Sequence, residues 1–180
     1  MANSLKINVF LIPEEGQHFV FSEGNAWFRE CFKDDEIPDF SLDRVTVDCL
    51  ITKTSGTVFI RGSFSALINI CCSRCLENTN LSIGSDFAYT LIPAKTEINE
   101  DQELKAEELE ISYYHGDFID LAPIICEKII LQIPIKVLCK EDCKGLCQHC
   151  GANLNVSSCN CRPDVVDSRM AVLKNLKIKN

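Results

Sequence analysis

Alternating apolar and polar positions along the first half of the chain predict a series of strands. Residues 5–12 alternate at first and then become wholly apolar, which is typical of a strand, and residues 19–21 predict a second, shorter strand. Residues 44–75 predict a hairpin that turns at residues 54–56. Gly62 lies inside the second strand of that hairpin, where a glycine indicates a bulge or a close approach of two backbones.

The rest of the chain predicts two further strands and few helices. Residues 79–92 alternate again, and residues 111–114 predict a short strand. Paired apolar positions four apart predict a short helix over residues 25–33. A second helix begins after Asp120, which can cap it, and carries Pro123 in its first turn. Because strands outnumber helices and do not alternate with them regularly, the predicted class is α+β with an antiparallel, β-rich body.

The chain contains 12 cysteines, and their spacing favours metal binding over disulfides. The N-terminus has no secretory-signal pattern and the chain has no apolar run long enough to span a membrane, so we expect a cytoplasmic protein with reduced thiols. Eight of the cysteines lie in tight clusters, as zinc sites require. These are Cys72, Cys75, Cys139, Cys143, Cys147, Cys150, Cys159 and Cys161.

The strongest local signal is Cys147-x-x-Cys150 followed by Gly151. Two thiolates three positions apart reach one tetrahedral ion when the chain turns sharply, and a glycine after the second allows the left-handed conformation that closes the turn. Structural zinc sites are closed at four ligands, so eight thiols predict one or two ions. The favoured pairing places Cys147, Cys150, Cys159 and Cys161 around one zinc, and Cys72, Cys75, Cys139 and Cys143 around the other.

Spacing raises one objection to the first of these sets. In an extended strand Cys159 and Cys161 would lie about 7 Å apart, at a rise of roughly 3.3 Å per residue. The chain must therefore bend at Asn160, or one of the two cysteines is not a ligand. His149 is a possible substitute ligand.

The remaining titratable residues suggest no catalytic centre. Cys31, Cys49, Cys71 and Cys126 fit small, buried apolar residues. His18 and His115 are expected in surface loops, and no nucleophile, metalloprotease or phosphate-binding motif occurs. We therefore predict no catalytic residues. The Cys72–Cys75 pair could instead be a redox motif, but a strand follows it rather than a helix.

Charge is distributed unevenly along the chain, whose net charge is −8. Residues 95–110 form an acidic stretch that predicts a solvated connecting loop, with a partner-docking surface as the alternative. The last 19 residues are basic, and a helix beginning at Asp167 or Ser168 would carry Met170, Leu173 and Leu176 on one face. Arg169, Lys174 and Lys177 are the candidates for a local contact with nucleic acid, although the net charge argues against a broad one.

Taken in order, several motifs resemble the YceD family, the large ribosomal RNA subunit accumulation proteins of bacteria and plastids. They cover roughly residues 45–178: Cys72-Ser-Arg-Cys-Leu-Glu77, Ile119-Asp-Leu121, Leu131-Gln-Ile-Pro134, Leu138-Cys139, Asp142-Cys-Lys-Gly-Leu-Cys147, Cys150-Gly-Ala-Asn-Leu-Asn155 and Asp167-Ser-Arg-Met-Ala-Val-Leu173. The resemblance implies a role in accumulation or processing of large-subunit (23S) ribosomal RNA without catalysis, with that RNA or its assembly and processing proteins as partners. It also implies that Cys72 and Cys75 are the shared motif and that the later cysteines mark cysteine-rich members.

The expected organisation is one family domain in three parts. A β-rich body spans 1–138, a zinc-binding segment spans 139–161, and a basic helix spans 162–180. The function expected is a zinc-stabilised scaffold or adaptor with neither a membrane nor a small-molecule substrate. The alternatives are a thiol or zinc enzyme (an oxidoreductase or a hydrolase), a zinc-ribbon nucleic-acid-binding protein, and a disulfide-linked secreted protein.

Overall fold

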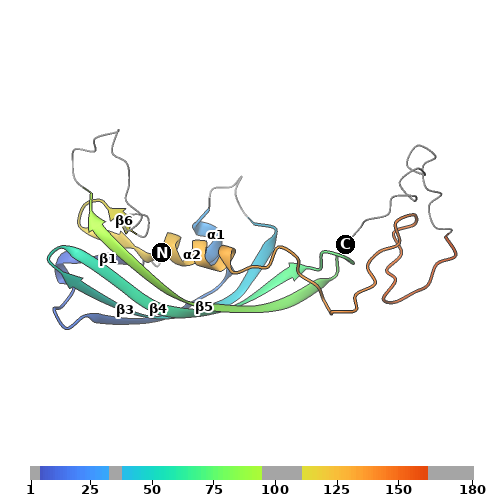
Figure 1. Cartoon of the computed structure of the whole chain (residues 1–180), viewed down its shortest axis with the longest axis horizontal. Coiled ribbons are helices and arrows are strands. Elements are labelled where there is room, and N and C mark those ends of the chain that lie inside the picture. The colour runs from blue at the N-terminus through green and yellow to red at the C-terminus, as the bar shows by residue number, and fades with distance from the viewer. Residues whose placement is uncertain (1–4, 33–37, 95–110, 162–180) are drawn as a thin grey trace, which may run out of the picture.

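A long, curved five-stranded sheet dominates the computed structural model, which describes residues 5–32, 38–94 and 111–161 (Figure 1). Its strands, in the order in which they lie side by side, are β2 (Gln17–Glu23), β3 (Phe40–Thr54), β4 (Thr57–Cys71), β5 (Asn78–Pro93) and β6 (Ile111–Tyr114). Neighbours pair antiparallel except β6, which runs parallel to β5. The predicted α+β class with a mainly antiparallel body is confirmed.

A second, two-stranded sheet and two short helices complete the body. Strands β1 (Lys6–Asn8) and β7 (Phe118–Asp120) pair antiparallel, and the helices are α1 (Asn25–Glu30) and α2 (Leu121–Leu131). The strand predicted over residues 5–12 is wrong in its second half, because a single 3-10 turn, η1 (Val9–Leu11), follows β1. The Asn8 side chain accepts a hydrogen bond from the backbone N–H of Phe10 and so caps this turn.

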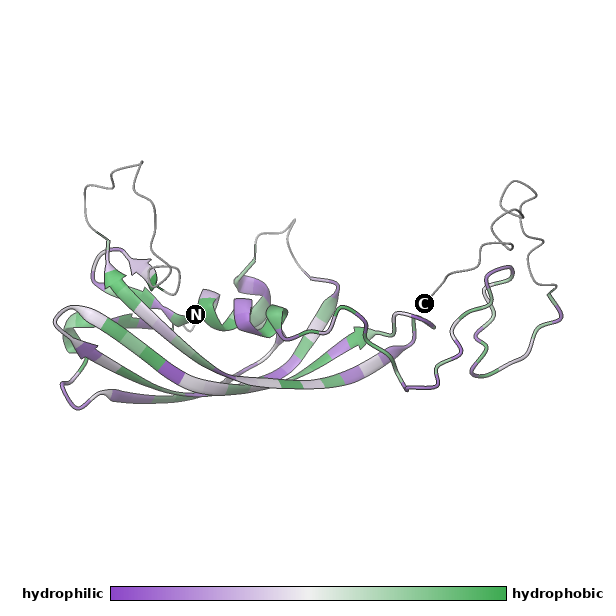
Figure 2. Ribbon diagram, in the orientation of Figure 1, coloured by the Kyte–Doolittle hydropathy of each residue, from purple (hydrophilic) through white to green (hydrophobic). Residues whose placement is uncertain are grey.

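The core lies between the large sheet and the helices, which cover the same face of it (Figure 1). Apolar and polar residues alternate along the long strands (Figure 2), so one face of each strand points toward the helices. Fully buried residues from both layers meet there: Phe28, Val47, Ile51, Ile60, Ile68, Ile125 and Ile129. Helix α2 begins as predicted, since the Asp120 carboxylate accepts a hydrogen bond from the N–H of Ala122 at 3.0 Å.

The β3–β4 hairpin is fixed by its turn and by one close approach. Ser55 and Gly56 both have positive φ, 50° and 88°, as the two-residue turn that suits twisted strands requires. At Gly62 a Cβ would overlap the carbonyl oxygen of Asp48 on β3, so this glycine marks a close approach of backbones. The bulge lies elsewhere, between Leu42 and Arg44.

The β4–β5 hairpin carries the cysteine-rich segment at its tip. Cys71 pairs with Asn78, and residues 72–77 form the connection beyond the last pair. The segment that follows α2 also runs to this end and extends beyond the sheet (Figure 1). The acidic stretch 95–110 and the helix predicted after Asp167 lie outside the described residues. In the described part of the chain, neither helix has the length and apolarity needed to cross a bilayer.

Candidate metal centres

Four cysteines from two distant parts of the chain form a first group, which we call the hairpin cluster: Cys72, Cys75, Cys139 and Cys143. The first two lie in the connection between β4 and β5, and the others follow α2. Their Sγ atoms all lie within 4.8 Å of one another. The Cys72–Cys143 and Cys75–Cys139 sulfur distances are 3.8 and 3.6 Å. Cys72, Cys75 and Cys143 are buried.

Hydrogen bonds hold the two halves of the hairpin cluster together. The backbone N–H of Ser73 donates to the carbonyl of Val137 at 2.8 Å, and the Val137 N–H donates to the Ser73 hydroxyl at 3.2 Å. The Arg74 guanidinium donates to the carbonyl of Cys143 at 2.7 Å. The hairpin tip is thereby joined to the segment after α2 by contacts independent of the sulfurs.

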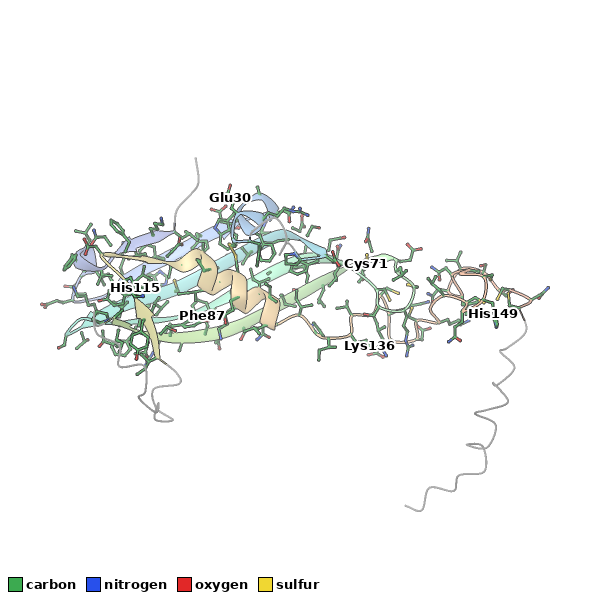
Figure 3. All side chains as sticks on the ribbon, turned by 90° about the horizontal axis from the view of Figure 1, so that it is seen from above. Glu30, Cys71, Phe87, His115, Lys136 and His149 are labelled. Carbon is green, nitrogen blue, oxygen red and sulfur yellow. A yellow bond between two sulfur atoms is a disulfide. The ribbon has the colours of Figure 1, made fainter. Side chains whose placement is uncertain are left out.

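A second group, the terminal cluster, comprises Cys147, Cys150, Cys159 and Cys161, again with all sulfurs within 4.8 Å. The turn between the first two is closed as its sequence suggests: Gly151 has a φ of 72°, and its N–H donates to the carbonyl of Cys147 at 2.9 Å. Cys150 and Cys161 are exposed, and Cys147 and Cys159 are half-buried. His149 is not among the four residues; it lies toward the far end of the segment (Figure 3).

Both groups fit a tetrahedral thiolate site. A zinc–sulfur bond of about 2.3 Å places the four sulfurs of a tetrahedron about 3.8 Å apart. The sulfur distances of 3.6 and 3.8 Å in the hairpin cluster are close to that edge length. Each group offers four sulfurs, which is the closed set typical of a structural ion rather than the three-ligand set of a catalytic one.

Backbone N–H groups favour one thiolate in each cluster. The N–H of Arg74, followed by that of Cys75, lowers the pKa of Cys72 to about 6. The N–H of Cys150, followed by that of His149, lowers the pKa of Cys147 to about 6. Burial raises the pKa of Cys139 to about 12, and the neighbouring Cys150 thiol raises that of Cys161 to about 12. A metal ion bound by all four sulfurs would therefore displace protons from Cys139 in one cluster and from Cys161 in the other.

The structure groups the eight cysteines in the two sets of four expected from the sequence. The objection to Cys159 and Cys161 is answered by local geometry, because residues 157–161 lie outside the strands and bring both sulfurs within reach of Cys147. Which of the eight bind metal stays a prediction. The nucleic-acid candidates Arg169, Lys174 and Lys177 lie outside the described residues.

The other four cysteines match the expectation of small buried side chains only in part. Cys49 and Cys126 are buried in the core as expected. Cys71 is exposed, because it lies on the solvent face at the end of β4, opposite to Cys72. Cys31 and Cys126 form a disulfide between α1 and α2, 95 residues apart in sequence. No spacing rule connects two such distant residues, so only the packing of the helices reveals the pair.

The histidines match their predicted exposure, though not in every detail. His18 lies in β2 rather than in a loop, with its Nε2 2.7 Å from an Asp48 carboxylate oxygen. His115 is exposed in the turn before β7, at the opposite end of the body from Cys71 (Figure 3).

Two asparagines that the sequence analysis did not single out connect the clusters. Asn155 donates from its amide to the Cys143 Sγ at 3.3 Å, and Asn153 donates to the Glu77 carboxylate at 3.2 Å. Both belong to the segment between Cys150 and Cys159. The only sequence signal was their position in the Gly-Ala-Asn-Leu-Asn motif.

These features define a class: a β-rich domain with a helix-covered sheet, whose longest hairpin ends in a four-cysteine centre and is followed by a second such centre. The model of the family described as large ribosomal RNA subunit accumulation protein YceD matches residues 60–177. The chain belongs to this family.

Two plant relatives carry the same description. The chain is 29% identical over 164 residues to the chloroplastic large ribosomal RNA subunit accumulation protein YCED homolog 1 of Arabidopsis thaliana, covering 79% of this chain and 50% of that protein. It is 31% identical over 144 residues to the homolog 1 of Zea mays, covering 66% and 48%. An uncharacterised protein of Bacillus subtilis is 34% identical over 71 residues, covering 39% and 41%.

The chain thus spans about half the length of the plant relatives it matches. No solved structure matches it.

Proposed function

We propose that this protein supports accumulation of the large ribosomal RNA subunit as a non-catalytic assembly factor, in which two structural zinc ions hold the cysteine-rich segment on the β-rich body. The role in RNA accumulation is supported by family membership and by the names of the plant relatives. The metal role is supported by one observation above all: eight cysteines are gathered into two sets of four whose sulfurs lie within 4.8 Å of one another.

The chemistry of the two clusters supports a scaffold rather than a catalyst. Four sulfur ligands close the coordination shell of zinc and leave no position for water or a substrate. In the hairpin cluster three of the four cysteines are also buried, so an ion there would stabilise a join between chain segments. The partners proposed are large-subunit ribosomal RNA or the proteins that assemble and process it.

Within this proposal, the β-rich body, residues 139–161 and residues 162–180 act as three parts of one domain. Arg169, Lys174 and Lys177 are proposed to contact RNA locally. Neutralising all three should weaken RNA binding and flatten its dependence on salt, because each phosphate contact releases a counterion.

The metal part is tested by elemental analysis of protein purified without added metal. We expect about two zinc ions per chain, with Cys72→Ser and Cys150→Ser each losing one. Cys71→Ser is the matched control, since Cys71 lies beside Cys72 but belongs to neither cluster. Iron in place of zinc, or no metal, would contradict this part of the proposal.

The cellular part is tested by depletion and complementation in the organism that encodes the chain. Depletion should lower large-subunit ribosomal RNA relative to the small-subunit RNA, and the wild-type chain and Cys71→Ser should restore it. Unchanged RNA levels and unchanged precursor ends after depletion would refute the role in accumulation.

Thiol reactivity separates the proposal from a thiol enzyme. Zinc thiolates resist alkylation until a chelator is added, whereas a redox-active pair at Cys72 and Cys75 reacts rapidly at neutral pH.

A further inference from the structure

The side chain of Asn155 contacts the hairpin cluster, although its own segment carries the terminal cluster. In sequence, Asn155 lies between Cys150 and Cys159, two cysteines of the terminal cluster. Its Nδ2 donates to the Sγ of Cys143 in the hairpin cluster at 3.3 Å. Its Oδ1 accepts from the backbone N–H of Lys144 at 2.8 Å. The Asn155 side chain therefore holds both the sulfur of Cys143 and the backbone N–H of the next residue, Lys144.

Asn153 fixes this amide and extends the contact to the hairpin tip. Its Oδ1 accepts hydrogen bonds from the Asn155 backbone N–H and from the Asn155 side chain, both at 3.0 Å. Its Nδ2 donates to the Glu77 carboxylate, two residues after Cys75, at 3.2 Å. The two asparagines thus contact both halves of the hairpin cluster, the half from β4–β5 and the half after α2.

Backbone hydrogen bonds also fix the short connection between the two clusters. Only three residues separate Cys143 from Cys147. In that connection the Leu146 N–H donates to the carbonyl of Arg74 at 3.1 Å, and the Gly145 carbonyl accepts from Leu154 at 2.9 Å. Gly145 is buried with a φ of 76°, and a Cβ there would meet the Arg74 carbonyl oxygen at 3.1 Å. The turn that carries Cys147 therefore packs directly against the turn that carries Cys72 and Cys75.

These contacts have a consequence for metal affinity. An N–H group that donates to a coordinating sulfur stabilises the thiolate and orients it, and removing such an outer contact costs about 10- to 100-fold in metal affinity. An ion at the terminal cluster would fix the segment that carries Asn155, and an ion at the hairpin cluster would fix Cys143 and Arg74, which contact that segment. A coupling of this kind is reciprocal between the two ions.

We propose that the two clusters bind their metal ions with positive coupling and that Asn155, through its hydrogen bond to the Cys143 sulfur, is the positioning residue that carries the coupling. This inference rests on the metal binding proposed above and adds to it a dependence of each site on the other.

The test is a zinc titration of the full chain, competed with a chromophoric chelator under reducing conditions. Cys150→Ser, which disables the terminal cluster, should lower the zinc affinity of the hairpin cluster about 10-fold. Asn155→Ala should lower it by a similar factor with both clusters intact. The double variant should lose little more than either single variant, because both changes break the same link. Asn80→Ala, which removes an exposed asparagine pair with Asn69 on the sheet, is the matched control and should bind as wild type.

A second variant separates the sulfur contact from a structural role in the turn. Asn155→Asp keeps an oxygen for the Lys144 N–H but has no N–H for the sulfur, so it should weaken hairpin-cluster binding at least as much as Asn155→Ala. Cobalt substitution adds a spectroscopic readout. With both clusters intact, replacing Asn155 should shift the sulfur-to-cobalt charge-transfer band, whereas in the Cys150→Ser background the same replacement should shift it little. Circular dichroism of each variant checks that the sheet is intact.

Several results would overturn the inference. Two zinc ions that bind independently, with multiplicative losses in the double variant, would remove the coupling and leave the proposed metal role intact. Coupling retained in Asn155→Asp would show that the sulfur contact does not carry it. A wild-type chain that takes up no metal would overturn both the inference and the metal part of the proposed function.

Discussion

The two cysteine clusters have the same ligand chemistry but belong to the molecule in different ways. Two cysteines of the hairpin cluster precede β5 in the sequence and two follow α2, and three of the four are buried. The terminal cluster draws all four from residues 147–161 and leaves Cys150 and Cys161 exposed. One centre therefore joins parts of the fold, whereas the other organises a short stretch of chain. Two sets of four cysteines with the same ligand chemistry therefore need not contribute equally to the structure.

The strongest way to sharpen this comparison is to remove one ligand from each cluster. With free metal at about 1,000 times its Kd, a bound ion contributes about 4 kcal/mol to stability. Cys72→Ser should lose most of that and lower Tm by about 8–16 °C, at 2–4 °C per kcal/mol for a chain of this size. Cys150→Ser should cost only about 1.4 kcal/mol, because the terminal cluster supports the body only through the 10-fold coupling. Calorimetry of the metal-loaded proteins measures both, and equal losses would contradict the distinction.

The Cys31–Cys126 disulfide offers a non-metal link for comparison. It joins α1 to α2 across 95 residues, so in the chain-entropy account its removal should destabilise the protein by about 2–4 kcal/mol. We expect reductant alone to destabilise oxidised protein by this amount without releasing metal, and chelator alone to release metal without opening the disulfide. A thiol count under denaturing conditions with chelator should give 10 free thiols before reduction and 12 after it.

The rate at which a chelator removes metal should differ between the two clusters, because their cysteines differ in exposure. The terminal cluster, with two exposed cysteines, should lose its ion first, at a rate at least about 10-fold faster, which corresponds to about 1.4 kcal/mol in the barrier. Stopped-flow transfer of zinc to a coloured chelator should then be biphasic. In Cys150→Ser the fast phase should disappear, whereas in Cys71→Ser both phases should persist.

The smallest expected effects concern the residue that follows each cysteine turn. Gly151 has a φ of 72°, and the equivalent position in the hairpin cluster is Leu76, with a φ of 60° and a side chain that is 65% exposed. A left-handed conformation costs a side-chain-bearing residue about 1–2 kcal/mol. Leu76→Gly should therefore stabilise the protein by about 0.5–1 kcal/mol after the added freedom of the unfolded chain is subtracted. Gly151→Ala should destabilise the terminal cluster by about 1 kcal/mol, and urea unfolding of metal-loaded protein measures both.

Local patterns were enough to predict most of the fold. The alternation in residues 44–92 gave β3, β4 and β5, and Asp120 gave the start of α2, because both features depend on neighbours in sequence. The 3-10 turn after Asn8 was missed because the apolar run of residues 9–12 satisfies a strand pattern equally well. The parallel pairing of β6 with β5 has no local signature at all.

In the candidate metal centres, too, local features could be predicted from the sequence and contacts between distant residues could not. The Cys147–Cys150–Gly151 turn could be predicted from spacing, because all its parts are local. The contact of Asn155 with Cys143 could not, because an asparagine two residues from another asparagine fits many turns equally well. The Cys31–Cys126 pair depends wholly on how α1 and α2 pack.

The separation of 64 residues between Cys75 and Cys139 has a consequence for the order in which the molecule is made. Synthesis exposes Cys72 and Cys75 long before their partners exist, and closing so long a loop carries an entropic cost that only non-local pairing offsets. The terminal cluster faces no such delay, because all four of its cysteines lie within residues 147–161 and emerge together. The four cysteines of the hairpin cluster can therefore come together only after β5 and α2 have folded into place, so an ion bound there as proposed would mark a completed body.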